Sequence, residues 1–243
     1  MNHFKLICID CNAAHKPSFE LLRCSKCDGI LDVEYSSSYI KEIRQNLSVD
    51  TLIELMTPVT DKESIVSLGE GNTPCTEIST VSSDFNQTLI AKLEYMNPTG
   101  SFKDRGVATM ISAAKYYGIT EIVEDSSGNA GASVAAYAAA AGIKSNIFVP
   151  SNAAGSKLAQ ISAYGAVVHK IDGSRSDVTD KLIAYKDKLD LHYASHAMSP
   201  FFIEGNKRFA YELALHLNGD LPEHIIFPVG NGGLILGAWK GLK

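Results

Sequence analysis

Four cysteines near the start of the chain have the spacing of a metal site. Cys8 and Cys11 form one Cys-x2-Cys pair, and Cys24 and Cys27 form a second pair after twelve residues. Two such pairs bring four thiolates to one ion and complete a closed tetrahedral site, as in structural zinc sites. A disulfide, for example between Cys8 and Cys27, is the alternative that an oxidising compartment would favour. The fifth cysteine, Cys75, is expected to be a buried small hydrophobe.

A lysine stands where a loop leads into an expected helix. The segment 97–106 reads NPTGSFKDRG, and its Ser101 and Asp104 resemble a capping box, although Glu or Gln is the usual partner. Lys103 then lies in the first turn, where the positive end of the helix dipole disfavours a cation and eases loss of a proton. A neutral lysine amine is what Schiff-base chemistry needs, whereas a solvated surface lysine is the plain alternative.

Two further glycine-bearing loops follow expected strands. The segment 124–131 reads EDSSGNAG and leads into an Ala-rich helix that Ser127 or Asn129 can cap, with backbone N–H groups free to bind a carboxylate. The segment 228–234 reads PVGNGGL, and its glycines let the backbone close around a phosphate. A plain capped helix and a tight turn are the respective alternatives. The segment 228–234 does not have the GxGxxG pattern and is not followed by a ribose-binding acid, so a dinucleotide ligand is disfavoured.

The elements that must position these loops alternate between strand and helix. Ser36, Ser37 and Ser38 form an expected linker, and a helix is expected over 39–56. The expected strands cover 89–93, 122–123, 146–149, 166–170 and 224–229, and the expected helices cover 107–114, 129–141, 155–163, 178–189 and 210–217. This alternation favours a parallel, doubly wound α/β architecture, which binds ligands where its strands lead into helices.

Length and composition narrow the class of protein. The chain has 243 residues, of which 45% are hydrophobic and 20% are charged, and its formal net charge is −5. The apolar fraction argues against disorder, and the acidic balance argues against a nucleic-acid partner. The longest apolar stretch, 130–143, is too short to span a membrane. The start of the chain has no signal-peptide pattern, so we expect a cytoplasmic protein.

An activated lysine, an anion-binding loop and a phosphate-binding loop are together the needs of pyridoxal 5′-phosphate. The chain resembles the threonine synthase family of fold-type-II pyridoxal-phosphate enzymes from about residue 64 to residue 243. The matching motifs are GEGNTP at 69–74, KLEYMNPTGSFKDRG at 92–106, SSGNAG at 126–131, EGNK at 204–207 and PVGNGG at 228–233. The resemblance implies two doubly wound parallel-sheet domains, and some relatives also carry an N-terminal zinc ribbon.

The resemblance also implies roles for individual residues. Lys103 would bind the cofactor covalently and move protons, and Asn129 would hydrogen-bond the cofactor's 3′-oxygen. The cofactor phosphate would be held by Gly230, Asn231, Gly232, Gly233 and Leu234. The substrate carboxylate would be bound by Ser126, Ser127, Gly128 and Ala130. The implied reaction is that of a lyase, which converts O-phospho-L-homoserine and water to L-threonine and phosphate.

One departure from the family pattern concerns the substrate. The segment 196–204 reads HAMSPFFIE, and Phe202 stands where the family has an arginine that binds the substrate's phosphate. A phenyl ring cannot form the bidentate contact of a guanidinium. Arg105, Lys157 and Lys207 are candidates to take over this role. The alternative reactions are a β-elimination or β-replacement, as in a threonine or serine dehydratase or a cysteate synthase.

A second departure is the end of the chain, which stops inside the helix after the phosphate loop. We therefore expect a piece of a longer protein, and an inactive fragment is a further alternative. The expected division is a zinc ribbon over 1–35, the start of the large domain over 36–104, an inserted small domain over 105–205 and an incomplete large-domain part over 206–243. The expected partners are an amino-acid substrate, no nucleic acid and no membrane, with a homodimer as a candidate assembly.

Overall fold

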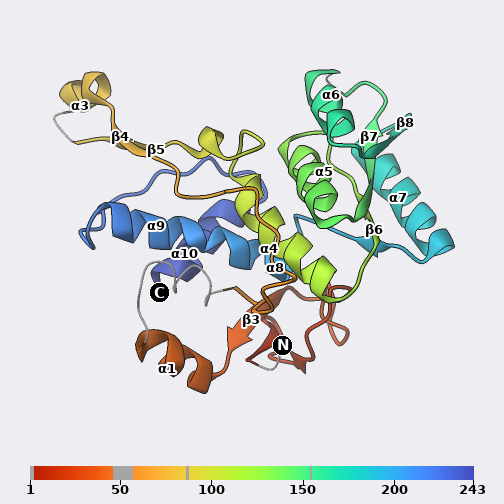
Figure 1. The fold of residues 1–243 in the computed structure, drawn as a ribbon, viewed down its shortest axis with the longest axis horizontal. Helices are drawn as coiled ribbons and strands as arrows, with labels where there is room; N and C mark the ends of the chain where they lie inside the picture. Colours follow the sequence, from red (N-terminus) through yellow and green to blue (C-terminus); the bar gives the residue numbers. More distant parts are fainter. Residues whose placement is uncertain (1–2, 46–56, 86–87, 154) are drawn as a thin grey trace.

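The N-terminal residues form a small antiparallel sheet at one end of the molecule. The computed structural model describes residues 3–45, 57–85, 88–153 and 155–243 (Figure 1). Strand β1 (Phe4–Cys8) lies between β2 (Ala14–His15) and β3 (Leu31–Tyr35), and helix α1 (Ser37–Gln45) follows. The inward side chains of β1 and β3 belong to the same apolar cluster as Phe201 and Phe202. The ribbon therefore shares its core with the rest of the chain.

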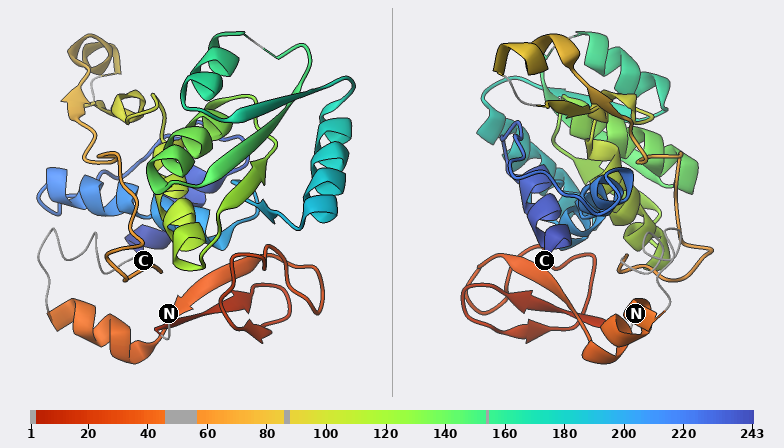
Figure 2. Two further views of the ribbon diagram at one scale, coloured as in Figure 1. Left: turned by 45° about the vertical axis from the view of Figure 1, so that its right-hand side comes forward. Right: turned by 90° about the vertical axis from the view of Figure 1, so that its left-hand side faces the viewer.

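A four-stranded parallel sheet forms the centre of the part of the chain over residues 121–193. Its order is β8 (Val167–Ile171), β7 (Lys144–Pro150), β6 (Glu121–Glu124) and β9 (His192–Tyr193). Helices α5 (Asn129–Ala141) and α6 (Gly155–Ala163) lie on one side of it, and α7 (Arg175–Leu189) lies on the other (Figures 1 and 2). Helices on both faces explain why β7 is buried from Ser145 to Val149. The parallel α/β prediction is confirmed.

The remaining elements carry the loops expected to do chemistry. Strands β4 (Cys75–Glu77) and β5 (Ile90–Lys92) form an antiparallel pair, and α3 (Ser79–Phe85) lies between them in the chain. The 3-10 helix η1 (Glu94–Met96) leads to α4 (Lys103–Tyr116). Helix α4 packs against α8 (Pro200–Asn206), and α10 (Gly233–Leu242) packs against α8 and α9 (Arg208–His216).

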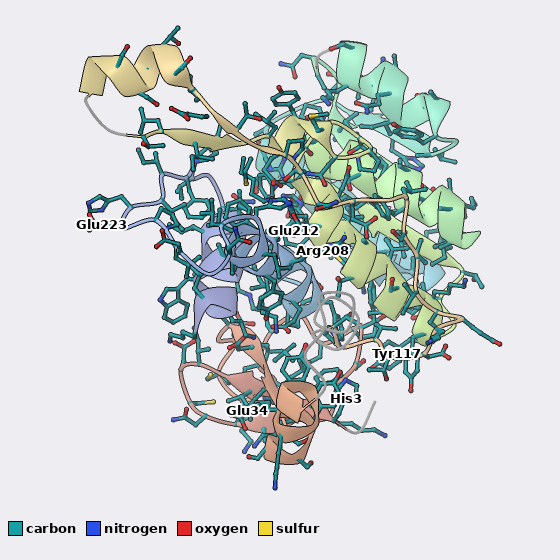
Figure 3. All side chains as sticks on the ribbon, turned by 60° about the vertical axis from the view of Figure 1, so that its left-hand side comes forward. His3, Glu34, Tyr117, Arg208, Glu212 and Glu223 are labelled. Atoms are coloured by element: carbon teal, nitrogen blue, oxygen red, sulfur yellow. The ribbon has the colours of Figure 1, made fainter. Side chains whose placement is uncertain are left out.

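A buried charge network fixes α4 against its neighbours. The Arg105 guanidinium donates to Glu94 at 2.7 Å and to both oxygens of Glu212 at 2.8 Å. Lys92 and Arg208 also pair with Glu212, at 3.1 and 2.9 Å. Figure 3 shows Arg208 and Glu212 side by side near the centre of the molecule. Because each buried charge has a partner, this network holds η1, α4 and α9 in one arrangement.

Several local expectations are wrong. Residues 224–229 form no strand: Ile226 is 90% exposed, and no neighbouring strand among the described residues pairs with this backbone. Ser101 and Asp104 form no capping box, because Asp104 accepts hydrogen bonds from the backbone N–H and hydroxyl of Thr99. Helix α5 begins after Gly128 with no side-chain cap.

Other expectations were partly met or fall outside the described residues. Cys75 is half-buried and not fully buried, because its thiol lies at the surface beside His216. The helix expected over 39–56 is described as α1 up to Gln45, and its part over 46–56 lies outside the described residues. Within the part of the chain that the structure describes, every helix is too short or too polar to cross a bilayer.

Candidate active site

Lys103 is the first residue of α4 and faces the glycine loop that precedes α10. A cavity of about 330 Å³ is lined by Phe102, Lys103 and residues 228–234. Gly232 adopts a φ of +81°, a conformation that favours glycine, and the helix begins at the next residue. The loop therefore presents backbone N–H groups at a helix N-terminus, which is a site for an anion, directly beside a lysine amine.

The environment of Lys103 makes its amine lose a proton more readily than an exposed lysine does. Burial lowers the pKa of Lys103, and the Glu124 carboxylate opposes that shift. The amine nitrogen lies 4.6 Å from the ring centroid of Phe102 and 5.5 Å from that of Phe202. The sequence predicted a lowered pKa from the helix dipole, whereas the larger cause in the structure is desolvation by burial.

A buried carboxylate and a histidine connect the parallel sheet to the glycine loop. Glu124, at the end of β6, accepts a hydrogen bond from His196 Nδ1 at 2.6 Å. His196 Nε2 lies 3.3 Å from the Asn231 amide nitrogen, so the ring connects the Glu124 carboxylate to the glycine loop. The second oxygen of Glu124 is buried without a partner among the described residues. Sequence reasoning did not single out Glu124 or this contact.

The loop over 126–130 lies at the start of α5. Ser126 is buried and accepts a hydrogen bond from the Gly128 N–H, and a Cβ on Gly131 would come within 1.9 Å of the Ser126 carbonyl oxygen. Ser133 donates to Asp104 at 2.6 Å, which fixes α5 to the start of α4. Ser126, Ser127, Gly128, Asn129 and Ala130 nevertheless line neither of the two cavities that Lys103 lines.

The three cations expected to replace the missing arginine do not line these cavities. Arg105 is bound to Glu94 and Glu212, Lys207 lies 2.5 Å from Glu204, and Lys157 donates to Gln160 on α6. Phe202 is buried between α4 and α10, where a Cβ on Gly106 or on Gly233 would come within 2.5 or 3.0 Å of its ring. The phenyl ring therefore fills the space between these two helices.

The four N-terminal cysteines lie together. Their sulfur atoms lie within 4.8 Å of one another, with 3.5 Å between Cys8 and Cys27 and 3.7 Å between Cys11 and Cys24. Tetrahedral coordination at 2.3 Å places sulfur atoms about 3.8 Å apart, so this group could hold one zinc ion. All four are free thiols, and the alternative disulfide between Cys8 and Cys27 is absent.

The comparisons with known proteins decide the family. The family model described as "Pyridoxal-phosphate dependent enzyme" matches residues 66–243. The chain belongs to this family. It is 35% identical to a threonine synthase of Methanocaldococcus jannaschii over 97% of this chain and 60% of that protein. It is 34% identical to a threonine synthase of Methanosarcina acetivorans over 100% of this chain and 60% of that protein.

Solved structures of the family show the same fold. A pyridoxal 5′-phosphate-dependent aspartate racemase matches 75% of this chain and 58% of its own, with a TM-score of 0.67 and 27% identity. O-acetylserine sulfhydrylase isoform 3 from Entamoeba histolytica matches 74% and 56%, with a TM-score of 0.66 and 27% identity. The fold-type-II prediction is confirmed. The chain spans about 60% of the length of the first curated relatives.

Proposed function

We propose that this chain binds pyridoxal 5′-phosphate on Lys103 and belongs to a lyase of the threonine synthase kind. One observation carries the proposal: a partly desolvated lysine amine and a glycine-rich helix N-terminus line one cavity. These groups fit the cofactor, because an aldehyde needs a neutral amine and its phosphate needs N–H donors. The cofactor phosphate would contact Gly230, Asn231, Gly232, Gly233 and Leu234.

The bound cofactor would supply an electron sink for carbanion chemistry, and the protein would supply orientation and proton transfer. The amine of Lys103 would hold and move a proton at its nitrogen, because burial keeps its pKa low. Asn129 would orient the ring through the 3′-oxygen. The carboxylate of an amino-acid substrate would bind at the N-terminus of α5, at Ser126, Ser127, Gly128 and Ala130.

The reaction that the curated relatives favour is the conversion of O-phospho-L-homoserine and water to L-threonine and phosphate. One observation favours a second candidate, a β-elimination or β-replacement. The sequence resemblance places Phe202 where the family has a phosphate-binding arginine, and Phe202 is packed on Gly106 and Gly233, so no guanidinium fits there without repacking. The domain division, the homodimer and the cytoplasmic location remain predictions.

We also propose that Cys8, Cys11, Cys24 and Cys27 hold one structural Zn²⁺. The two cysteine pairs adopt matching turns, because Asn12 and Asp28, which follow the second cysteine of each pair, both adopt a positive φ. Lys26 donates its backbone N–H to the Cys24 sulfur at 3.4 Å, which stabilises a thiolate. We expect about one zinc per chain and loss of order in the ribbon in Cys8→Ser.

The cofactor proposal is tested on the full chain incubated with pyridoxal 5′-phosphate. Wild type should show visible absorbance of the bound cofactor, and borohydride reduction followed by peptide mass spectrometry should place the added mass on Lys103. Lys103→Ala should lose both signals, whereas Lys115→Ala, an exposed lysine on the same helix, should keep them. Cofactor mass on another lysine, or absorbance retained in Lys103→Ala, would contradict the proposal.

A further inference from the structure

The second cavity that Lys103 lines is closed by the zinc ribbon. This cavity has a volume of about 140 Å³, and Lys103, His196, Phe202 and Asn231 line it from the body of the protein. The ribbon contributes Leu22, Arg23, Ile30 and Leu31. The ribbon thus forms one wall of the candidate active site.

The lining of this cavity, from the ribbon and from the body of the protein together, contains no carboxylate. The ionisable side chains in the lining are Arg23, Lys103 and His196, and the lining includes no Asp or Glu. Arg23 is exposed, whereas Leu31 and Phe202 in the same lining are buried and supply apolar surface. The cavity therefore fits an anionic group.

Arg23 is the cation that the ribbon contributes to this lining, and its exposed side chain has no carboxylate within salt-bridge distance among the described residues. Its one hydrogen bond among the described residues is long, 3.5 Å from a guanidinium nitrogen to the Asp28 carbonyl oxygen. By contrast, Arg105 and Lys207, which the sequence offered for the same task, are buried against carboxylates. A guanidinium with unused N–H donors matches a phosphate in geometry and charge.

We propose that Arg23 binds the phosphoryl group of the substrate and so replaces the arginine that Phe202 displaces. The inference rests on the proposed function, because it assumes that the chemistry occurs at Lys103. It assigns the ribbon a part in substrate specificity in addition to its structural role. Because Arg23 precedes Cys24 directly, the metal site fixes its backbone relative to the cavity.

The test measures binding of inorganic phosphate to the full chain loaded with pyridoxal 5′-phosphate and zinc, by isothermal titration calorimetry. Loading occupies the glycine loop, so the added phosphate reports on the remaining site. Arg23→Ala should raise the dissociation constant about tenfold, because a charge-assisted contact is lost. Arg23→Lys should give an intermediate value, since it keeps the charge without the planar fork.

Lys16→Ala is the matched control, because Lys16 is an exposed cation on the same ribbon that does not line the cavity. It should bind phosphate as wild type does. Equal affinity in wild type and Arg23→Ala, or no phosphate binding by the loaded wild type, would overturn the proposal. Cofactor absorbance and zinc content are measured first in every variant. If wild type fails to load the cofactor, the proposed function is contradicted. If it loads the cofactor but Arg23→Ala binds phosphate as wild type does, only the role of Arg23 is contradicted.

Discussion

At the scale of single residues, the protonation of Lys103 depends on two opposing effects. Burial lowers its pKa, and the Glu124 carboxylate raises it. Glu124→Gln removes the negative charge and keeps a side chain that can accept the His196 hydrogen bond. The pKa of Lys103 should therefore fall further, and the midpoint of the pH profile for cofactor loading should move to lower pH.

The control for this prediction is Asp125→Asn, the neighbouring carboxylate. Asp125 is bound to Tyr193 and Thr179 and does not shift the pKa of Lys103. Its loading profile should match that of wild type. The profiles are measured from the visible absorbance of the loaded chain between pH 6 and about 10, a range that brackets a lowered lysine pKa. An unchanged midpoint in Glu124→Gln contradicts the assigned electrostatic effect.

The sequence could propose candidate site residues only within one contiguous motif. Lys103 and the loop 230–234 were proposed because of the residues beside them in the chain, and the structure places both in the lining of one cavity. The contact between Glu124 and His196 joins positions 72 residues apart, and Arg23 reaches the cavity only because the ribbon docks there. Such tertiary contacts leave no local pattern, so the sequence offered Arg105, Lys157 and Lys207 instead.

At the scale of elements, the first turn of α4, which carries Lys103, is held in place by Arg105. The Arg105 side chain is fully buried and pairs with Glu94 and Glu212. Arg105→Met should lower the free energy of unfolding by about 3–5 kcal/mol, because Glu94 loses its cation and the buried Glu212 keeps only Lys92 and Arg208. Urea denaturation measures the change. Lys5→Ala, which breaks an exposed pair with Glu34, should leave stability close to wild type.

The same network predicts how this stabilisation depends on pH. Burial would raise the pKa of Glu212, but the hydrogen-bonded Arg105 outweighs it and holds the pKa at about 2, below the ordinary 4.5. A depressed acid stabilises the fold above its unfolded pKa, so this contribution is present above about pH 4.5 and disappears as the pH falls through about 2. Stability curves of wild type and Arg105→Met should converge in acid. A constant difference contradicts the assignment.

The helices and strands were predictable where burial is periodic or continuous. The helix over 129–141 has the predicted bounds, and β7 extends the predicted strand over 146–149. The segment 224–229 has the same apolar composition as a strand and failed, because strand formation needs a hydrogen-bonded neighbour. Helix α8 was missed, since its sequence over 200–206 contains a proline and a glycine and its stability comes from packing on α4.

At the scale of the whole molecule, the ribbon is held against the candidate active site by a buried charge cluster. Tyr35 donates to Glu204 at 2.6 Å, and Lys207 and Lys240 lie 2.5 Å from the same carboxylate. Lys240, on α10, also donates to the Val33 carbonyl oxygen of the ribbon at 2.9 Å. Figure 2 shows the ribbon sheet, formed by β1, β2 and β3, lying across one end of the molecule beneath the C-terminal helix α10. One cluster therefore connects β3, α8 and α10.

This docking predicts that the proposed metal controls anion binding from outside the cavity. Apart from the two-residue strand β2, the described segment 11–30 that carries three of the four cysteines forms no helix or strand, so much of its order would come from zinc. Removing the metal with a chelator from the loaded chain should release Arg23 and raise the dissociation constant for phosphate about tenfold, toward that of Arg23→Ala. Cofactor absorbance should persist, because Lys103 and the loop 230–234 lie outside the ribbon.

Combining the two changes tests whether they act through one contact. Chelator treatment of Arg23→Ala should cause little further loss, because the arginine through which the metal acts is already gone. Treatment of Lys16→Ala should reproduce the wild-type loss in full. If the metal-free wild type bound phosphate as tightly as the zinc-loaded chain, Arg23 would be held by the body of the protein alone. If instead chelation weakened Arg23→Ala about tenfold as well, the metal would act on the cavity by a route that does not involve this arginine.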